Sequence, residues 1–341
     1  MVRPQSNPAS RFGLPELAWE EPPELARLQI YEDHTKGILS RNDSPDLWHT
    51  WSLNPYRGCQ HACAYCYARY THEYLGFGAG TDHDVKILVK PAAPALLTEV
   101  FEDPKWLGER VLFSGNTDCY QPLEHRYRLT RACLEVCLTY RNPISIITKA
   151  ALIERDVDLL AALAREAGAT VTLSVPFIDA TLARLIEPGA PSPQRRLRAM
   201  RRLHEAGVPV SVNIAPVIPG INDREVPAVL QAAREAGAQH AAMMLVRLSG
   251  PVAQVFEARV REALPDRAAG VLARLRRARN GALTDHRFGK RFHGEGPEWA
   301  AVERLFAMWS TRLGYTKASR EDGATPFRRP PRAGQQMGLF G

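Results

Sequence analysis

Three stretches of this sequence end in the same tripeptide, Glu-Ala-Gly, and an apolar run follows each one directly. The tripeptides occupy positions 166–168, 205–207 and 235–237. The residues before the first two tripeptides place leucine or methionine at helical spacing, and glycine is the residue that most readily ends a helix. Helices that alternate with strands are typical of parallel sheets. The chain is therefore constrained to an alternating α/β fold.

The other segments extend this alternation. Apolar runs that predict strands span 110–115, 143–149, 170–175, 208–217 and 240–248, and a first strand is expected just before Cys59. Helices are expected over 155–167, 194–206 and 224–236. About six such units predict a partial TIM-like (β/α)6 barrel, in which functional residues gather at the C-terminal ends of the strands.

The flanks of the chain have a different composition. Residues 1–45 are rich in Pro, Asn, Ser and Glu without a sustained period, which predicts an N-terminal arm. The barrel core is expected over 46–250, and a small helical or loop extension over 251–317. Residues 318–341, rich in Pro, Gly and Arg, have too little apolar surface to offset the cost of ordering, so a flexible basic tail is expected there.

Charge and cysteine content narrow the class of protein. No signal peptide and no apolar run of membrane-spanning length is found, so we expect a cytoplasmic protein that is not in a membrane. That compartment is reducing, and closely spaced cysteines there more often bind metal or do redox chemistry than form disulfides. The net charge of +7 suits an acidic partner such as DNA, although many arginine-rich proteins are basic without binding nucleic acid.

The motif NPYRGCQHACAYCYAR, residues 54–69, places Cys59, Cys63 and Cys66 in CxxxCxxC spacing. Cysteine thiolates hold [4Fe–4S] clusters, usually four of them, so three on one loop leave one iron without a protein ligand. A zinc site with His61 or His72 as the fourth ligand is the alternative. Zinc sites usually contain paired CxxC-type knuckles, and this sequence has no second CxxC-type pair, so the spacing favours the cluster.

The spacing, the aromatic Tyr65 before the last cysteine and the position after a first strand resemble the radical S-adenosylmethionine (radical SAM) signature. The resemblance implies that Cys59, Cys63 and Cys66 ligate the cluster, that its open iron binds S-adenosylmethionine, and that Tyr65 packs near the adenine. One-electron reduction would then cleave the sulfonium to a 5′-deoxyadenosyl radical. The electron is expected from a reductant such as flavodoxin or ferredoxin.

Within radical SAM proteins, most of residues 50–250 look closest to the spore photoproduct lyase-like or DNA-repair-photolyase-like group. In RVLFSGNTDCYQ the resemblance implies a small polar segment that accepts the amino group of the cofactor, formed by Ser114, Asn116, Thr117 and Asp118. A helix cap explains these residue types equally well. In ISIITKA, Lys149 would meet the cofactor carboxylate, whereas without the resemblance it reads as a surface lysine.

Two later segments carry the same resemblance. In TLSVPFIDATLARLIEPGAPSPQRRLRAM, Ser174 would contact the cofactor ribose or carboxylate, and Arg196, or Arg195 as the alternative, would be the matching arginine. The other arginines of this helix read as a solvated face. In VNIAPVIPGIND, Asn213 would pack against the adenine and ribose, although the turn that follows is also an ordinary loop signal.

The remaining cysteines fall into two groups. Cys133 and Cys137 lie four positions apart on one face of an expected helix, which favours core packing over a second cluster. Cys119 follows the polar segment and is a candidate hydrogen donor to a product radical, or an inert thiol. The lyase-like enzymes carry their hydrogen-donating cysteine just ahead of this segment, where Gly115 or Asn116 stands here.

The C-terminal residues resemble the short peptide with which bacterial repair proteins dock on the DNA polymerase sliding clamp, through Gln336, Met337, Leu339 and Phe340. Basic segments at 195–202, 271–281 and 328–332 offer arginines to phosphates. Three functions follow as hypotheses. The first is a radical SAM enzyme acting on DNA lesions, the second is a radical SAM enzyme modifying RNA, protein or a small molecule, and the third is a non-enzymatic iron–sulfur adaptor.

Overall fold

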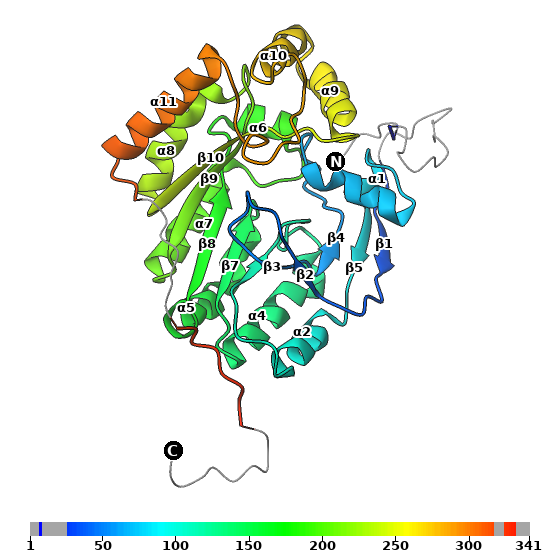
Figure 1. The fold of residues 1–341 in the computed structure, drawn as a ribbon, viewed down its shortest axis with the longest axis vertical. Coiled ribbons are helices and arrows are strands. Elements are labelled where there is room, and N and C mark those ends of the chain that lie inside the picture. The colour runs from blue at the N-terminus through cyan, green and yellow to red at the C-terminus, as the bar shows by residue number, and fades with distance from the viewer. Residues whose placement is uncertain (1–6, 9–25, 317–323, 332–341) are drawn as a thin grey trace.

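The computed structural model describes residues 7–8, 26–316 and 324–331 of the chain. A seven-stranded sheet lies at its centre, in the order β10-β9-β8-β7-β6-β3-β2 (Figure 1). Neighbouring strands from β3 to β10 are parallel, and only β2 runs antiparallel to its neighbour. The strands are β2 (Leu39–Arg41), β3 (Trp51–Leu53), β6 (Val111–Phe113), β7 (Ile144–Thr148), β8 (Ala169–Ser174), β9 (Val210–Val217) and β10 (His240–Leu245). The mixed α/β fold with a parallel sheet, expected as a partial (β/α)6 barrel, is confirmed.

The first parallel strand lies slightly earlier than expected. The stretch directly before Cys59 is β4, and it belongs to a small second sheet in the order β1-β5-β4. The members of that sheet are β1 (Gln29–Glu32), β4 (Tyr56–Arg57) and β5 (Lys86–Val89). The strand that begins the large sheet is instead β3, because its residues pair in parallel with β6.

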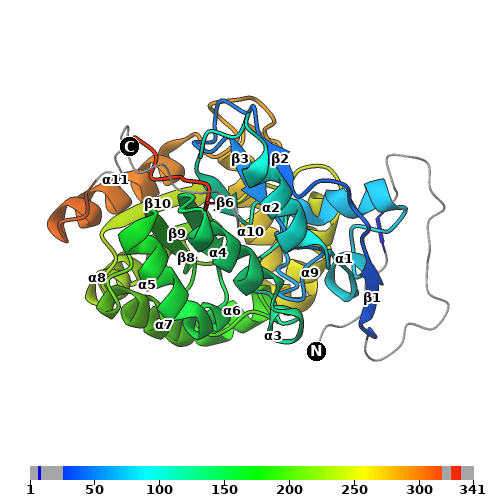
Figure 2. The same cartoon turned by 90° about the horizontal axis from the view of Figure 1, so that it is seen from below.

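One face of the large sheet is covered by helices, as Figure 2 shows. The longer helices are α2 (Ala93–Glu102), α4 (Leu129–Thr139), α5 (Val157–Glu166), α7 (Pro193–Glu205) and α8 (Val226–Glu235). The three that were expected are confirmed, and the glycines that follow them, Gly168, Gly207 and Gly237, have φ values of 78°, 82° and 98°. Glycine takes this left-handed conformation without steric cost, which is why each of these helices ends there.

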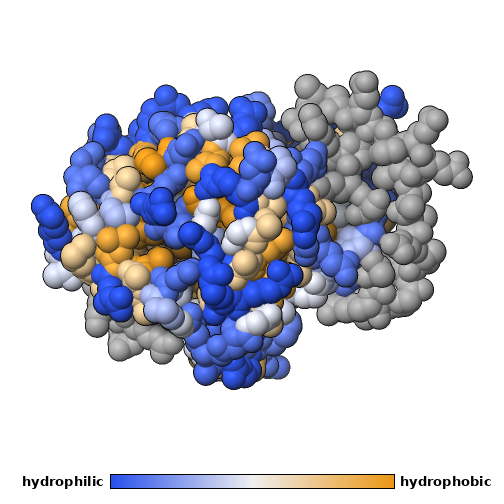
Figure 3. Space-filling model, turned by 90° about the horizontal axis from the view of Figure 1, so that it is seen from above, coloured by the Kyte–Doolittle hydropathy of each residue, from blue (hydrophilic) through white to orange (hydrophobic). Residues whose placement is uncertain are grey.

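The remaining helices are short or belong to the C-terminal extension. They are α1 (Asp82–Val85), α3 (Glu124–Tyr127), α6 (Ala180–Ile186), α9 (Val252–Ala263), α10 (Pro265–Arg277) and α11 (Pro297–Arg312), with 3-10 helices η1 (Tyr67–Leu75), η2 (Ala151–Asp156) and η3 (Asp223–Glu225). The face seen from above Figure 1 is mostly hydrophilic with apolar residues interspersed (Figure 3). Among the described residues, no helix combines the length and apolar character needed to cross a membrane.

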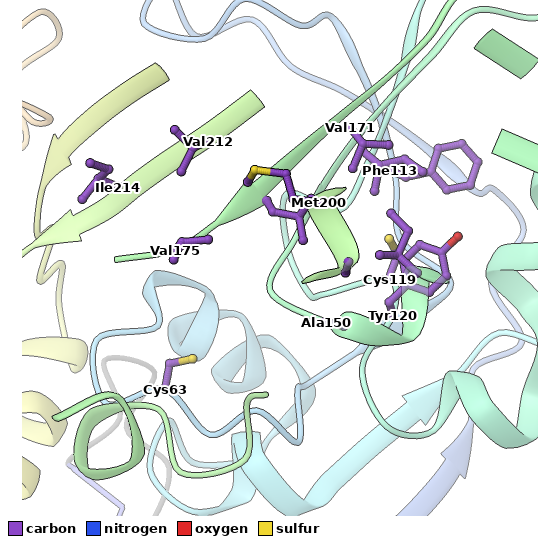
Figure 4. Close-up of a cluster of buried hydrophobic side chains, with 14 of the residues drawn as sticks. Cys63, Phe113, Cys119, Tyr120, Ala150, Val171, Val175, Met200, Val212 and Ile214 are labelled. Atoms are coloured by element: carbon purple, nitrogen blue, oxygen red, sulfur yellow. The ribbon is translucent and has the colours of Figure 1, made fainter. Parts of the chain in front are cut away.

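The two faces of the sheet differ in chemistry because side chains alternate along each strand. Val171 and Val212 are fully buried on the face where Met200 of α7 packs (Figure 4). The residues that alternate with them are small and polar. Across the strands, Ser145 pairs with Thr170, Thr172 pairs with Ser211, and Ser174 pairs with Asn213. The face turned away from the helices therefore carries hydroxyl and amide groups on β7, β8 and β9, together with apolar residues such as Leu112 and Ile147.

Parts of both flanks are built into the fold. Within the predicted arm, β1 is a strand of the small sheet and β2 is a strand of the large sheet. Within the predicted flexible tail, residues 324–331 lie against the core instead: Thr325 Oγ1 donates to the Gly108 carbonyl at 2.8 Å, and Arg329 Nε donates to the Phe101 carbonyl at 2.9 Å. The Phe327 ring stacks 6.3 Å from that of Tyr140. These contacts hold the segment against the core, although the composition predicted a flexible tail. Gln336, Met337, Leu339 and Phe340 lie outside the described residues, so clamp docking stays a prediction.

Candidate active site at the strand ends

The cysteine motif forms a loop between β4 and η1. Two backbone turns shape it, because the Ala62 N–H donates to the Cys59 carbonyl and the Cys66 N–H donates to the Cys63 carbonyl, both at 3.2 Å. Cys59 and Cys63 are buried and Cys66 is half-buried. Burial, followed by the negative charge of Glu187, raises the pKa of the Cys63 thiol to about 12, and burial also raises those of Cys59 and Cys66. Iron or zinc binding would have to displace these protons.

The loop is tied to the segment that follows β6. Thr117 Oγ1 and Gln121 Nε2 both donate to the Gly58 carbonyl, at 2.5 Å and 3.1 Å. Asn54 Oδ1 in turn accepts the backbone N–H groups of Asn116 and Thr117, at 3.0 Å and 3.2 Å. These bonds bring the cysteine loop and the polar segment together, as the sequence predicted for neighbouring strand ends.

A second attachment joins the loop to the connection after α6. Ala64 N–H donates to the Ile186 carbonyl at 2.9 Å, and Gly189 N–H donates to the His61 carbonyl at 3.0 Å. A Cβ atom at Gly189 would collide with the Gln60 carbonyl oxygen, so the backbones approach more closely than any other residue permits. Gly189, in the sequence Glu187-Pro188-Gly189, is therefore required for this contact.

Glu187 is the residue at which these elements meet. Its carboxylate, 1 % exposed, accepts hydrogen bonds from the Tyr65 hydroxyl and from Arg196 Nη2. Arg196 also donates to the Ser174 carbonyl at 3.1 Å. Burial would raise the pKa of Glu187, but the charges of Arg196 and Lys149 outweigh it and hold the pKa below its ordinary value. Sequence reasoning missed Glu187 as a site residue, because an acid ahead of Pro-Gly reads as part of a turn.

Asp118 links the ends of β6 and β7. Its Oδ1 accepts from Thr148 Oγ1 at 2.7 Å, its Oδ2 accepts from the Lys149 backbone N–H at 2.8 Å, and His61 Nδ1 lies 3.4 Å from Oδ2. The Lys149 ammonium lies 5.6 Å from the centroid of the Tyr65 ring. The structure thus brings Asp118 and Lys149 close to the cysteine loop, which carries Tyr65 and His61, and the Lys149 side chain is only partly buried.

Further predicted residues lie at the ends of β6 and β8 and in the middle of β9. Ser174 and Asn213 are paired across β8 and β9 and are 3 % and 8 % exposed. Asn213 Oδ1 is buried and has no hydrogen-bond partner among the described residues, so this acceptor is left for a group that the chain does not supply. Ser114 has φ of 95°, an uncommon conformation for a residue other than glycine, and its hydroxyl accepts from the Cys119 N–H at 3.3 Å.

The other cysteines and histidines occupy different surroundings. Cys119 is fully buried beside Tyr120, apart from the loop that carries Cys63 (Figure 4), and its role as hydrogen donor stays a prediction. Cys133 and Cys137 are fully buried in the core, as their helical spacing predicted. His72 Nε2 is bonded to the Lys86 carbonyl at 2.9 Å. In the part of the chain that the structure describes, no three His, Cys, Asp or Glu side chains are arranged as a single-ion site.

A loop over residues 286–293 connects the two edges of the large sheet. Phe292 accepts the Leu245 N–H at 3.0 Å beside β10, and Arg291 Nε lies 2.6 Å from a carboxylate oxygen of Asp46, which precedes β3. Arg247, directly after β10, is half-buried, and burial together with the positive charge of Arg291 lowers its pKa. Phe288 of this loop is 61 % exposed. An aromatic and cationic rim therefore lies at the C-terminal end of β10.

The buried groups of the site predict a loss of stability in acid. Burial lowers the pKa of His83 to about 3, so the folded chain keeps this histidine neutral while the unfolded chain binds a proton below about pH 6.5. The free energy of unfolding should fall between pH 6.5 and pH 4.5 by about 1.4 kcal/mol per pH unit for this residue. Below about pH 4.5, protonation of Glu187, whose pKa is depressed in the fold, should remove more stability.

Urea unfolding at pH 7, 6 and 5 measures this dependence. His83→Asn should reduce the slope by about one proton equivalent, because the variant has no ring to protonate. An equal slope in wild type and variant would contradict the assignment to His83.

This chain resembles known proteins in sequence and in fold. The family model of the radical SAM superfamily matches residues 53–233. An uncharacterized protein of Mycobacterium tuberculosis is 37 % identical over 202 residues, which is 59 % of each chain. An uncharacterized protein of Methanocaldococcus jannaschii is 32 % identical over 173 residues, which is 51 % of this chain and 62 % of that protein. The match thus spans less than two thirds of these relatives. Among solved structures, spore photoproduct lyase complexed with dinucleoside spore photoproduct has a TM-score of 0.59 at 17 % identity, covering 84 % of this chain and 80 % of the lyase, which indicates a shared fold.

Proposed function

Because the chain belongs to the radical SAM superfamily, whose members use a [4Fe–4S] cluster and S-adenosylmethionine, we propose that Cys59, Cys63 and Cys66 hold the cluster in this enzyme. When bound, these two cofactors supply a 5′-deoxyadenosyl radical that abstracts hydrogen from a substrate. The observation that carries the proposal is the anchoring of the cysteine loop to the segment after β6 and to the connection after α6. Three thiols and no fourth cysteine on that loop suit a cluster with one open iron.

The strand ends offer the groups that S-adenosylmethionine needs. Lys149 suits its carboxylate, and Tyr65 suits the adenine. The unpartnered Oδ1 of Asn213, beside Ser174, suits a ribose hydroxyl. Arg196 would act indirectly, because its guanidinium holds Glu187 and the Ser174 carbonyl in place. Ser114, Asn116, Thr117 and Asp118 are the candidates for the amino group, and the carboxylate of Asp118 also accepts from Thr148 and from the Lys149 backbone.

For the substrate we propose a lesion in DNA. Spore photoproduct lyase, the fold neighbour, has been solved with a dinucleoside spore photoproduct. The net charge of +7 favours a polyanion, and the rim with Arg247 and the exposed Phe288 offers a cation and an aromatic face, the pair that unstacked bases and their phosphates prefer. Radical SAM enzymes require an electron donor, for which flavodoxin or ferredoxin is the proposed reductant.

The test measures 5′-deoxyadenosine after anaerobic reconstitution with iron and sulfide, reduction and addition of S-adenosylmethionine. The expected result is cleavage that ultraviolet-irradiated duplex DNA accelerates by about tenfold or more over the same duplex without irradiation, since a correct substrate completes the site. Cleavage that is indifferent to every DNA would remove the lesion proposal and favour an RNA, protein or small-molecule substrate. A stable cluster without any cleavage would favour the adaptor hypothesis.

A further inference from the structure

Two arginines donate hydrogen bonds to backbone carbonyls of the cysteine loop, and both form ion pairs with the carboxylate of Asp84. Arg69 of η1 donates to the Cys63 carbonyl through Nη2 at 2.8 Å and to Asp84 Oδ1 at 2.7 Å. Arg259 of α9 donates to the Ala62 carbonyl through Nη1 at 2.6 Å and forms an ion pair with the same Asp84. The side chains of Arg69 and Asp84 are fully buried, and that of Arg259 is 11 % exposed. The loop thus rests on a buried Arg69–Asp84–Arg259 triad.

The bond from Arg259 reaches a strained point of the loop. Ala62 has φ of 54°, in the left-handed region that costs a residue with a Cβ about 1 kcal/mol. Such conformations persist only where the surroundings hold them. The carbonyl of Ala62, between Cys59 and Cys63, points to Arg259, and the next carbonyl, that of Cys63, points to Arg69. The two guanidinium groups therefore fix the turn that sets the direction of the cysteine side chains.

The triad also has a charge. Two guanidinium groups and one carboxylate leave a net positive charge beside the loop, in a site shielded from water. His83 Nδ1 also faces this carboxylate, 3.4 Å from Asp84 Oδ1. An electron that enters an iron–sulfur cluster makes the cluster more negative, and a nearby fixed cation stabilises that reduced state.

Arg259 comes from a part of the chain that the superfamily model does not cover. The match ends at residue 233, whereas α9 spans Val252–Ala263 in the C-terminal extension. In both views of the ribbon α9 lies beside α1, which carries Asp84 (Figures 1 and 2). Arg259 thus connects the extension to the cysteine loop.

We infer that Arg259 is a positioning residue for the iron–sulfur cluster, which holds the Ala62 turn and, with Arg69, raises the reduction potential of the cluster. The inference rests on the proposed function, because it needs the cluster on Cys59, Cys63 and Cys66. The direction in which a substitution shifts the reduction potential follows from the charge that it removes from the triad. Removing a guanidinium should make reduction harder, and removing the carboxylate should make reduction easier.

The test is a redox titration of the reconstituted full-length protein, followed by absorbance and by electron paramagnetic resonance. Arg259→Gln should lower the equilibrium constant for one-electron reduction by about tenfold, a shift of about 59 mV to more negative potential. Asp84→Asn should shift the potential in the positive direction. Arg259→Lys should restore the potential of the wild type, while its stability stays lower because an ammonium cannot serve both acceptors in the same geometry.

Arg261→Gln is the matched control, since Arg261 lies on the same helix but is exposed and paired with Glu257 at 2.7 Å. Its potential should equal that of the wild type. Equal potentials in Arg259→Gln, Asp84→Asn and wild type, at full iron content, would overturn the inference and leave the triad a purely structural support. If Arg259→Gln does not fold, the Asp84→Asn variant alone tests the inference: a shift to more positive potential supports it, and an unchanged or more negative potential contradicts it. Failure of the wild type to form any cluster would instead refute the proposed function, and this inference with it.

Discussion

Replacement of Cys66 by alanine is expected to abolish both the iron–sulfur absorbance and the formation of 5′-deoxyadenosine. The motif then retains two thiols, those of Cys59 and Cys63, which is too few for the usual ligation of a [4Fe–4S] cluster. Loss of a residue that merely supports a ligand typically costs 10–100-fold in metal affinity or activity, so loss of a ligand should exceed about 100-fold. Iron and sulfide content after anaerobic reconstitution, together with 5′-deoxyadenosine yield, measure the effect.

Cys133→Ala is the matched control for this experiment. Cys133 is a fully buried cysteine in α4, so its replacement removes a thiol from the protein without touching the motif. The control should bind iron and cleave S-adenosylmethionine as the wild type does. Full iron content in Cys66→Ala would show that the ligands have been assigned wrongly. Zinc in place of iron in the wild type would favour the alternative of a structural zinc site.

Replacement of Glu187 by alanine is expected to lower the free energy of unfolding by about 3–5 kcal/mol, the usual cost of removing one partner from a buried ion pair. The cost arises because Arg196, 1 % exposed, would keep its charge in a site without a counterion, and because the Tyr65 hydroxyl would lose its acceptor. Equilibrium unfolding in urea measures the change. The effect on S-adenosylmethionine cleavage should be comparably large, since the same carboxylate joins the cysteine loop to the end of β8.

Two variants separate the buried pair from an ordinary surface charge. Glu298→Ala removes the partner of Arg277 from a pair in which both side chains are more than half exposed, and should cost less than about 1 kcal/mol. The double variant Glu187→Gln with Arg196→Met removes both charges and should recover part of the loss, because no charge is left buried and unpaired. Equal losses in Glu187→Ala and Glu298→Ala would contradict the role assigned to Glu187.

Features encoded over short stretches were predictable from the sequence. The strands at 143–149 and 170–175 and the helices that end at Gly168 and Gly207 were found within a few residues, because hydrophobic periodicity and glycine conformation are local properties. The cysteine motif was recognisable for the same reason. Its three cysteines lie within eight positions, so spacing alone indicates one loop.

Contacts between distant segments were not predictable in this way. Tyr65 and Glu187 are 122 positions apart, and Asp84 and Arg259 are 175 positions apart. A buried glutamate and an exposed one have the same local signature, since only the assembled fold decides whether water or an arginine neutralises the charge. The segment 324–331 was also not predictable from its own residues, because its composition is that of a flexible tail. It lies against the core because the Phe327 ring packs on the rings of Phe101 and Tyr140.

The amino-acid sequence by itself thus determined the alternating α/β fold and the cysteine loop, because short-range spacing specifies both. Only the tertiary structure decided which groups surround that loop: Glu187, Arg196, Asp84 and Arg259 come from separate elements and meet through long-range packing. The physical reason is that a hydrogen bond or ion pair depends on distance in space and on exclusion of water, and neither quantity is encoded in the neighbours of a residue along the chain.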